Sequence, residues 1–378
     1  MPPPLLPPAM KQEKLRPSQV RRMRRQLQPS SLPLFKTAAE PFGSAWRQDP
    51  ALTSSSLTVL VSALFGWALV LVVSRMLLIG FGFDPWLFTL IQMLTGGIFL
   101  IAVAGRGPAV GGALRNPWTW VYGTLRIVTA ALFTAALVHI STANAAFLAI
   151  TSVPISAVML WLVLSRRPLR QELPGHALII GGLVLLVFTL DGGWHNPAIL
   201  LMAGSEICVV ATTAIAELHP LNRTNDMRQR ASLTGVMLLA SALVMLASAL
   251  GLAFAATWLP GLRELVPVSL PWLADPALAL DPFLWILAAA VGIALRGPSM
   301  FFSLKAIYLV RTENYLAAMA ALPFMCMLLE SIAYAAGWLP PVTLASPTTA
   351  FGLIMTLGSL AVLWGRSRAA RSARMAQA

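Results

Sequence analysis

Charged side chains are scarce in this chain. They make up 11% of its 378 residues, whereas a soluble domain carries about 25%. Acidic residues are scarcest, with 14 aspartates and glutamates against 27 lysines and arginines, while apolar residues reach 57%. So little charge excludes an ordinary soluble domain and indicates an integral membrane protein. The basic residues concentrate at the ends and in short loops, so we expect no nucleic acid partner.

Reactive and metal-binding residues are few and scattered. Both cysteines, Cys208 and Cys326, lie inside apolar segments and are interpreted as small buried side chains. The four histidines fall in separate segments without metal-ligand spacing, at His139, His176, His195 and His219. No glycine-rich phosphate loop with a lysine is present. We therefore expect no metal, no cofactor and no enzymatic activity, with a membrane-embedded scaffold, receptor or enzyme without transport activity as the alternative.

Ten apolar segments are long enough to cross a membrane, and in lipid each must be helical because unpaired backbone amides are costly there. They are residues 57–79, 85–105, 117–140, 142–164, 174–191, 197–219, 231–258, 282–305, 313–336 and 347–365. With both termini in the cytoplasm, nine loop arginines face inward and only Arg263 faces outward. The sequence thus predicts an all-α membrane protein with ten transmembrane helices and cytoplasmic termini.

Three kinds of residue recur along the chain at nearly constant spacing. The matching sets are Gly175 and Gly181 with Gly352 and Gly358, Pro154 with Pro323, and Arg126 with Arg296. Their offsets of 177, 169 and 170 residues are those of one duplication followed by a small insertion. Two units of five spans insert in opposite orientations, as in many secondary transporters. We expect inverted repeats over residues 57–191 and 197–365.

The two ends of the chain stand apart from these repeats. Residues 1–53 are basic and proline-rich without the apolar core of a signal peptide, which predicts a disordered cytoplasmic tail. This tail either attracts anionic lipid headgroups or is an extension without a role of its own. Residues 366–378 form a second basic tail that would orient the last helix.

Arg126 and Arg296 are the main candidates for contact with cargo. Each lies near the middle of an apolar segment, where a charge costs about 2.5–3.5 kcal/mol and must face a partner or water. Related by the duplication, they would flank one cavity and hold a carboxylate or phosphate. The alternative is a structural ion pair with Glu206.

Glu330 is the candidate for proton coupling, because it is a lone carboxylate in an apolar segment. The alternative is that Arg75 neutralises it in an ion pair. Glu217 and Glu313 lie near helix ends, where we expect them to be solvated interfacial charges.

Other polar and aromatic residues complete the predicted binding site. Gln92, Asn144 and Asn314 could donate hydrogen bonds to cargo, or could instead join helices to one another. Trp67 and Tyr122 are candidate cavity aromatics, although aromatic residues more often pack or lie at interfaces.

Pro154 and Pro323 interrupt corresponding helices and are candidate hinges. The alternative is that they only shape packing, because prolines are tolerated in membrane helices.

Three stretches of the chain resemble a known family. The first unit contains SALFGWALVLVVSRML and ALVHISTANAAFLAITSVPISAVMLWLVLSRRPLRQELPGHALIIGGLVLLV, and the second contains FFSLKAIYLVRTENYLAAMAALPFMCMLLE followed by GLIMTLGSLAVLW. These stretches resemble the EamA-type domain of the drug/metabolite transporter superfamily, which implies ten helices in two inverted repeats in a bacterial inner membrane. The superfamily moves amino acids, sugars, nucleotide conjugates and drugs, so the resemblance does not identify the substrate.

Together these features predict a secondary transporter that exports a small anionic or zwitterionic metabolite by alternating access, as a monomer or homodimer. Proton coupling and exchange are both open as its mode of energisation.

Overall fold

The computed structural model describes residues 53–105, 108–136, 139–140, 142–190, 192–224, 226–259, 261, 264, 266, 271–339 and 347–375. The expected N-terminal tail, apart from Thr53, lies outside the described residues. Within the described residues the secondary structure is helical, without a β-strand.

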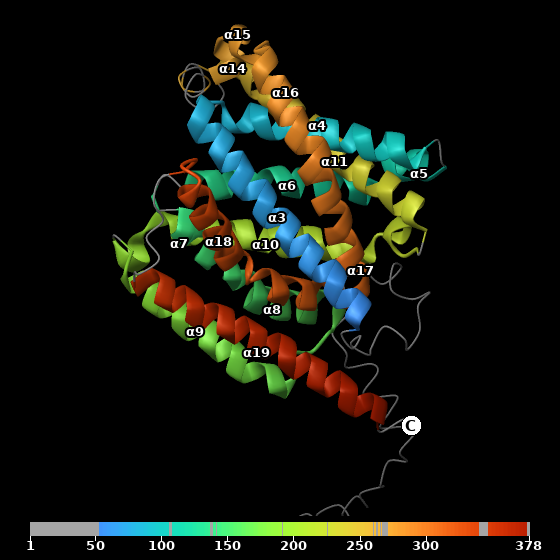
Figure 1. The fold of residues 1–378 in the computed structure, drawn as a ribbon, viewed down its shortest axis with the longest axis vertical. Helices are drawn as coiled ribbons and strands as arrows, with labels where there is room; N and C mark the ends of the chain where they lie inside the picture. Colours follow the sequence, from blue (N-terminus) through green and yellow to red (C-terminus); the bar gives the residue numbers. More distant parts are fainter. Residues whose placement is uncertain are drawn as a thin grey trace, which may run out of the picture. The chain divides into compact units, whose positions relative to one another are not determined.

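The helices fall in two groups along the sequence (Figure 1). The first comprises α3 (Ser54–Phe81), α4 (Pro85–Ala104), α5 (Pro108–Arg115), α6 (Pro117–Ala136), α7 (Thr142–Leu148), α8 (Ser152–Leu164) and α9 (Leu173–Phe188). The second comprises α10 (Pro197–Leu218), α11 (Met227–Ala256), α14 (Pro271–Ala274), α15 (Pro276–Ala279), α16 (Pro282–Val291), α17 (Gly297–Met319), α18 (Leu322–Ala335) and α19 (Pro347–Met375).

An acidic or amide side chain followed by proline starts three of the long helices. Asp84 accepts a hydrogen bond of 2.7 Å from the Leu87 amide ahead of α4, and Asn196 accepts one of 2.9 Å from the Ala198 amide ahead of α10. Asp281 caps α16 in the same way. The proline then occupies the first helical position, where its missing amide proton costs nothing.

Helices occupy all ten of the expected segments, but ten membrane spans are not confirmed. In the described part of the chain, eight helices are long and apolar enough to cross a membrane. Two of the ten expected segments do not meet this criterion. One contains α6, which carries Arg126, and the other contains α18, which has only 14 residues. The last helix also continues to Met375, beyond its expected end at residue 365.

Two of the expected spans are interrupted near their prolines. A 3-10 turn, η3 (Ala149–Thr151), separates α7 from α8, and Pro154 is the third residue of α8. In the second group a turn at residues 320–321 separates α17 from α18, and Pro323 is the second residue of α18. Proline fits the first turn of a helix, so each proline begins a half-helix.

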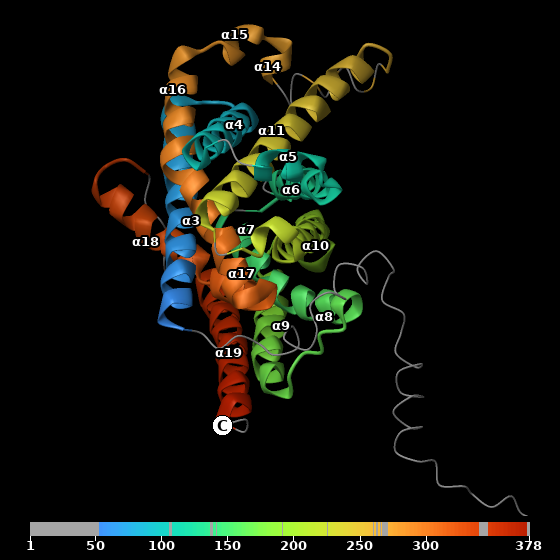
Figure 2. The ribbon, with the colours of Figure 1, turned by 90° about the vertical axis from the view of Figure 1, so that its right-hand side faces the viewer.

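Helices at corresponding places in the two groups pack on corresponding helices of the chain. α3 packs on α17 and α18, while α10 packs on α6 and α8. α4 packs on α11, and α9 packs on α19, as Figures 1 and 2 show for this last pair. These contacts of the first group therefore have counterparts in the second.

Large apolar side chains point outward from these helices. Leu162, Leu200 and Ile286 are 70%, 80% and 65% exposed. Many exposed apolar side chains on successive helices suit a lipid surround and would promote aggregation in water.

Candidate functional site

A cavity of about 290 Å³ lies between the two groups of helices. The first group contributes Trp67, Tyr122 and Arg126 to its wall, from α3 and α6. The second contributes Glu206, Ser303 and Tyr315, from α10 and α17. Four predicted site residues, Trp67, Tyr122, Arg126 and Glu206, are thus brought to one cavity.

Trp67 is held in place within this wall. Its Nε1 donates a hydrogen bond of 2.7 Å to Oγ of Ser303, and the Tyr315 hydroxyl donates one of 3.1 Å to the same oxygen. The guanidinium of Arg126 lies 5.1 Å from the centroid of the indole, and that of Arg296 lies 5.7 Å from it. Both distances suit cation–π attraction, so one ring is shared by two cations.

Arg296 does not line the cavity, although the duplication predicted that both arginines would flank it. It lies on a π-helical turn, η7 (Gly292–Arg296), and is buried. Its Nη1 donates a hydrogen bond of 3.1 Å to Gln92 Oε1, and Gln92 in turn donates to Ser74. The π turn and the hydrogen bond to Gln92 hold its side chain outside the cavity lining, and its role in binding cargo stays a prediction.

Glu206 is buried in the cavity wall, with 4% of its surface exposed. Among the described residues, no ion pair joins its carboxylate to Arg126 or Arg296. The alternative reading of the arginines, a structural ion pair with Glu206, is therefore not what the structure contains. The cavity instead presents one cation and one carboxylate that do not neutralise each other.

Glu330 pairs with Arg75 just beyond one end of the cavity. Each lies one helical turn past a lining residue, Leu71 on α3 and Cys326 on α18. This arrangement is the ion pair that we considered as the alternative to proton coupling.

The remaining predicted residues, apart from Pro323, lie outside the cavity wall. Asn314 is buried in α17 and its Oδ1 has no hydrogen-bond partner among the described residues. Asn144 lies on α7. Neither lines the cavity. Of the two prolines, Pro323 lines it and Pro154 does not.

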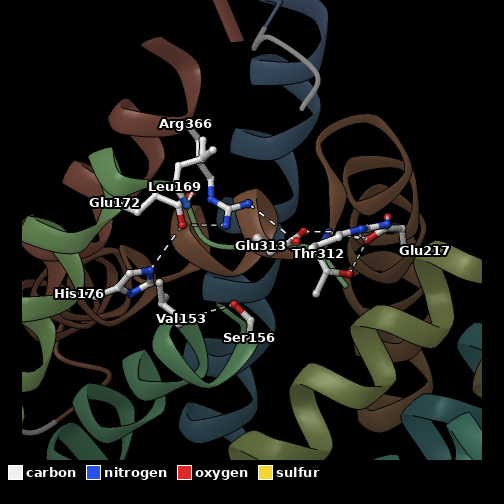
Figure 3. Close-up of polar contacts among 10 residues, drawn as sticks. Val153, Ser156, Leu169, Glu172, His176, Glu217, Thr312, Glu313 and Arg366 are labelled. Carbon is white, nitrogen blue, oxygen red and sulfur yellow. Dashed lines mark hydrogen bonds and ion pairs between the residues drawn. The ribbon is translucent and has the colours of Figure 1, made fainter. Parts of the chain in front are cut away.

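A buried ion-pair network lies where the predictions expected solvated charges (Figure 3). Glu217 and Glu313 are 2% and 4% exposed. Arg166 donates to Glu217 at 2.5 Å and to Glu313 at 3.3 Å. Thr312 donates to Glu217 from its amide at 3.0 Å and from its hydroxyl at 2.8 Å. The expectation of interfacial solvation was wrong because the ends of α8 and α10 meet α17 here, beside its break at Arg311.

The network extends to α9 and α19. Arg366 donates to Glu172 at 2.8 Å and lies 3.8 Å from Glu313. His176 lies 3.5 Å from Glu172, one helical turn away. The one signal of this network in the sequence was Arg166, which comes just after an apolar segment. Its side chain pairs with carboxylates rather than with lipid headgroups.

The helices of spanning length and the comparisons support a multi-pass membrane protein. Residues 54–188 match the EamA-like transporter family. The match covers α3 to α9 and confirms the expected resemblance to this family of the drug/metabolite transporter superfamily.

Solved structures show that the fold extends beyond this segment. Among them, 27 chains match. One, described only as "Crystal structure of protein", has a TM-score of 0.55 and 18% identity over 82% of this chain and 97% of its own. At that identity the likeness shows the fold alone. Among curated proteins, none matches.

Proposed function

We propose that this protein is a secondary transporter of a small zwitterionic metabolite. The proposal rests on Arg126 and Glu206. Both side chains line the same cavity, and among the described residues they form no ion pair with each other. Glu206 is buried and Arg126 is half-buried, and a charge in a membrane protein is costly without an opposite charge, so a cargo that brings the opposite charges would stabilise both side chains.

In this proposal Arg126 holds the carboxylate of the cargo and Glu206 holds its cationic group. Guanidinium binds carboxylate through paired hydrogen bonds, which also set its orientation. Trp67 and Tyr122 supply apolar surface for the rest of the molecule. A volume of about 290 Å³ limits the cargo to a small metabolite.

The exchanged packing of the two groups of helices supports alternating access as the mechanism. We propose that residues 57–191 and 197–365 are inverted repeats of five spanning helices each, with α6 and α18 as the two additional spans. The half-helix breaks at Pro154 and Pro323 would be the points about which the cavity opens to either side. We place both termini in the cytoplasm of a bacterium and propose export as the direction.

Coupling would act at Glu206 rather than Glu330. Glu330 is engaged by Arg75, whereas Glu206 faces the cavity, where cargo or a proton can reach it. Proton coupling and exchange of one cargo for another then share this carboxylate.

The test is uptake by proteoliposomes containing the full-length protein. A panel of radiolabelled amino acids supplies zwitterions, their N-acetyl derivatives supply anions, and their methyl esters supply cations. We expect saturable uptake of at least one zwitterion. Glu206→Gln should shift the preference toward the N-acetyl anion, and Arg126→Gln toward the ester.

Matched controls are Arg115→Gln and Glu264→Gln, which neutralise exposed charges away from the cavity. Unchanged zwitterion uptake in both cavity variants would refute the charge assignment. Chemical conversion of the cargo would identify an enzyme. The absence of both conversion and uptake across the whole panel would favour a scaffold or receptor.

A further inference from the structure

Two groups of ion pairs bracket the cavity. We call Arg75 with Glu330 the Arg75 pair, which lies one turn beyond the lining residues of α3 and α18. We call Arg166 with Glu217 and Glu313 the Glu217 cluster. Glu217 directly follows Ala216, a lining residue of α10, and Glu313 lies two residues before Tyr315, a lining residue of α17.

These two groups lie at opposite ends of α3. Near the start of α3, Val59 belongs to the same core cluster as Val310, which lies three residues before Glu313. Toward the end of α3, Leu77 belongs to a different cluster with Leu284, near the start of α16. α3 therefore runs antiparallel to the α16–α17 segment, with the Glu217 cluster beside its beginning and Arg75 near its end.

The two groups also join helices that occupy exchanged positions. The Arg75 pair links α3 to α18, and the Glu217 cluster links α10 to the end of α8. α3 is the first helix of the first group of helices and α10 is the first helix of the second, and the two make equivalent contacts. Arg75 is the twenty-second residue of α3 and Glu217 the twenty-first of α10, so they occupy matching places with opposite charge.

The two groups differ in how firmly they are closed. In the Glu217 cluster the side chains of Arg166 and Glu217 are 17% and 2% exposed, whereas those of Arg75 and Glu330 are 37% and 13% exposed. Glu217 also accepts two hydrogen bonds from Thr312. This conformation is therefore held more firmly at the Glu217 end.

We propose that the Arg75 pair and the Glu217 cluster are alternating latches at the two ends of the cavity. Opening at the Glu217 end separates Arg166 from Glu217 and tightens the Arg75 pair. Opening at the other end separates Arg75 from Glu330 while the Glu217 cluster stays closed. Each latch stabilises one state, so removing one shifts the population toward the conformation open at that end. The proposal rests on the proposed transport function.

Cys326 provides a reporter that does not require a known cargo. It lines the cavity one turn from Glu330, and Cys208→Ser removes the other cysteine. The measurement is the rate at which a membrane-impermeant maleimide alkylates Cys326 when added to one side or the other of oriented vesicles. Neutralising both partners of a latch avoids leaving a buried charge unpaired.

We expect the double variant Arg75→Gln with Glu330→Gln to raise the rate of Cys326 labelling from the Arg75 side by about tenfold. A rise of this size corresponds to a tenfold change in the ratio of open to closed protein. Arg166→Gln with Glu217→Gln should raise labelling from the opposite side and lower it from the Arg75 side, while Glu313 keeps Arg366 as a partner. The exchange Arg75→Glu with Glu330→Arg should restore the original rates and shows that the altered pair still folds. Arg115→Gln is the matched control at an exposed arginine.

Labelling that does not depend on side, or that both double variants change equally, would overturn the latch proposal. If side-dependent changes occur in a protein that moves no cargo, the latches stand and the proposed function is wrong. If cargo moves and the double variants leave labelling unchanged, the function stands and the latches are wrong.

Discussion

Gly175 of α9 and Gly358 of α19 meet backbone to backbone. A Cβ atom added at Gly175 would lie 2.5 Å from the Gly358 carbonyl oxygen, and one added at Gly358 would lie 2.7 Å from the Gly175 carbonyl oxygen. The first glycine of one motif copy therefore contacts the second glycine of the other. The duplicated motif thus makes a close backbone contact between the last helices of the two groups, as small residues do at membrane helix interfaces.

Gly175→Ala should destabilise the protein, whereas Gly181→Ala should not. The methyl at residue 175 meets backbone atoms that cannot move aside, at a cost of about 1–3 kcal/mol. The same methyl at residue 181 meets nothing within 4 Å. Thermal unfolding in detergent measures both variants. Equal melting temperatures would show that α9 and α19 separate without loss of stability.

The sequence predicted this contact only in part. The regular spacing of the motif selected Gly181, but Gly182 is the residue that approaches α19, against Met355. The helical period leaves residues 175 and 182 on one face, seven apart, and turns residue 181 away. A motif defined by matching letters therefore cannot identify which glycine is in contact.

The helices themselves were predictable, because apolar length and the Asx–Pro starts are local features of the sequence. The cavity was predictable through Arg126 and Glu206, since charges in spanning helices must meet one another, water or cargo. The position of Arg296 depends on a π turn, and the Glu217 cluster depends on where distant helix ends converge. Neither has a local signature, so the sequence could not reveal them.

Replacing Trp67 tests the shared indole. Trp67→Phe keeps an aromatic ring but removes the hydrogen bond to Ser303, and Trp67→Leu removes the ring that both Arg126 and Arg296 approach. We expect the apparent affinity for cargo to fall in both, and further in Trp67→Leu, by about 1–2 kcal/mol for lost cation–π attraction. Uptake kinetics in proteoliposomes give the KM.

The control for this pair of variants is Trp194→Leu, because Trp194 is half exposed outside the cavity. An unchanged KM in Trp67→Leu would mean that the indole only fills space beside the two arginines.

His219 should make the protein sensitive to acid. It lies directly after α10 and is buried, with its Nδ1 accepting from the Leu221 amide at 3.3 Å and its Nε2 3.3 Å from the Thr119 hydroxyl. Burial, aided by the charge of Arg223, lowers the pKa of His219 to about 4. The pKa of a histidine in an unfolded chain is about 6.5. As pH falls from about 6.5 toward 4, the unfolded chain takes up a proton that the folded chain does not, and stability is lost.

Thermal unfolding at pH 7.5 and pH 5 checks this expectation. The wild-type protein should lose on the order of 1 kcal/mol or more between these values, and His219→Asn should lose less. His195→Asn is the control, since His195 is exposed. A pH dependence that His219→Asn leaves intact would assign the acid sensitivity to other groups.

Arg311 separates two stretches of α17 in a backbone conformation that only glycine adopts readily. Its φ is 66° and its ψ is 167°, and Thr312, which follows, donates both of its hydrogen bonds to Glu217. Such a conformation costs a side-chain-bearing residue about 1–3 kcal/mol. The buried contacts of Thr312 and Glu313 hold it in place.

Arg311→Gly removes this strain together with the side chain, and Arg311→Ala removes the side chain alone. The difference between them therefore isolates the backbone term. We expect the glycine variant to be more stable than the alanine variant by about 1 kcal/mol or more in thermal unfolding. Because relief of strain favours the conformation in which Thr312 meets Glu217, Arg311→Gly should also slow labelling of Cys326 from the Glu217 side relative to Arg311→Ala. Equal stability and equal labelling of the two variants would mean that the break at residue 311 is relaxed and takes no part in opening the cavity.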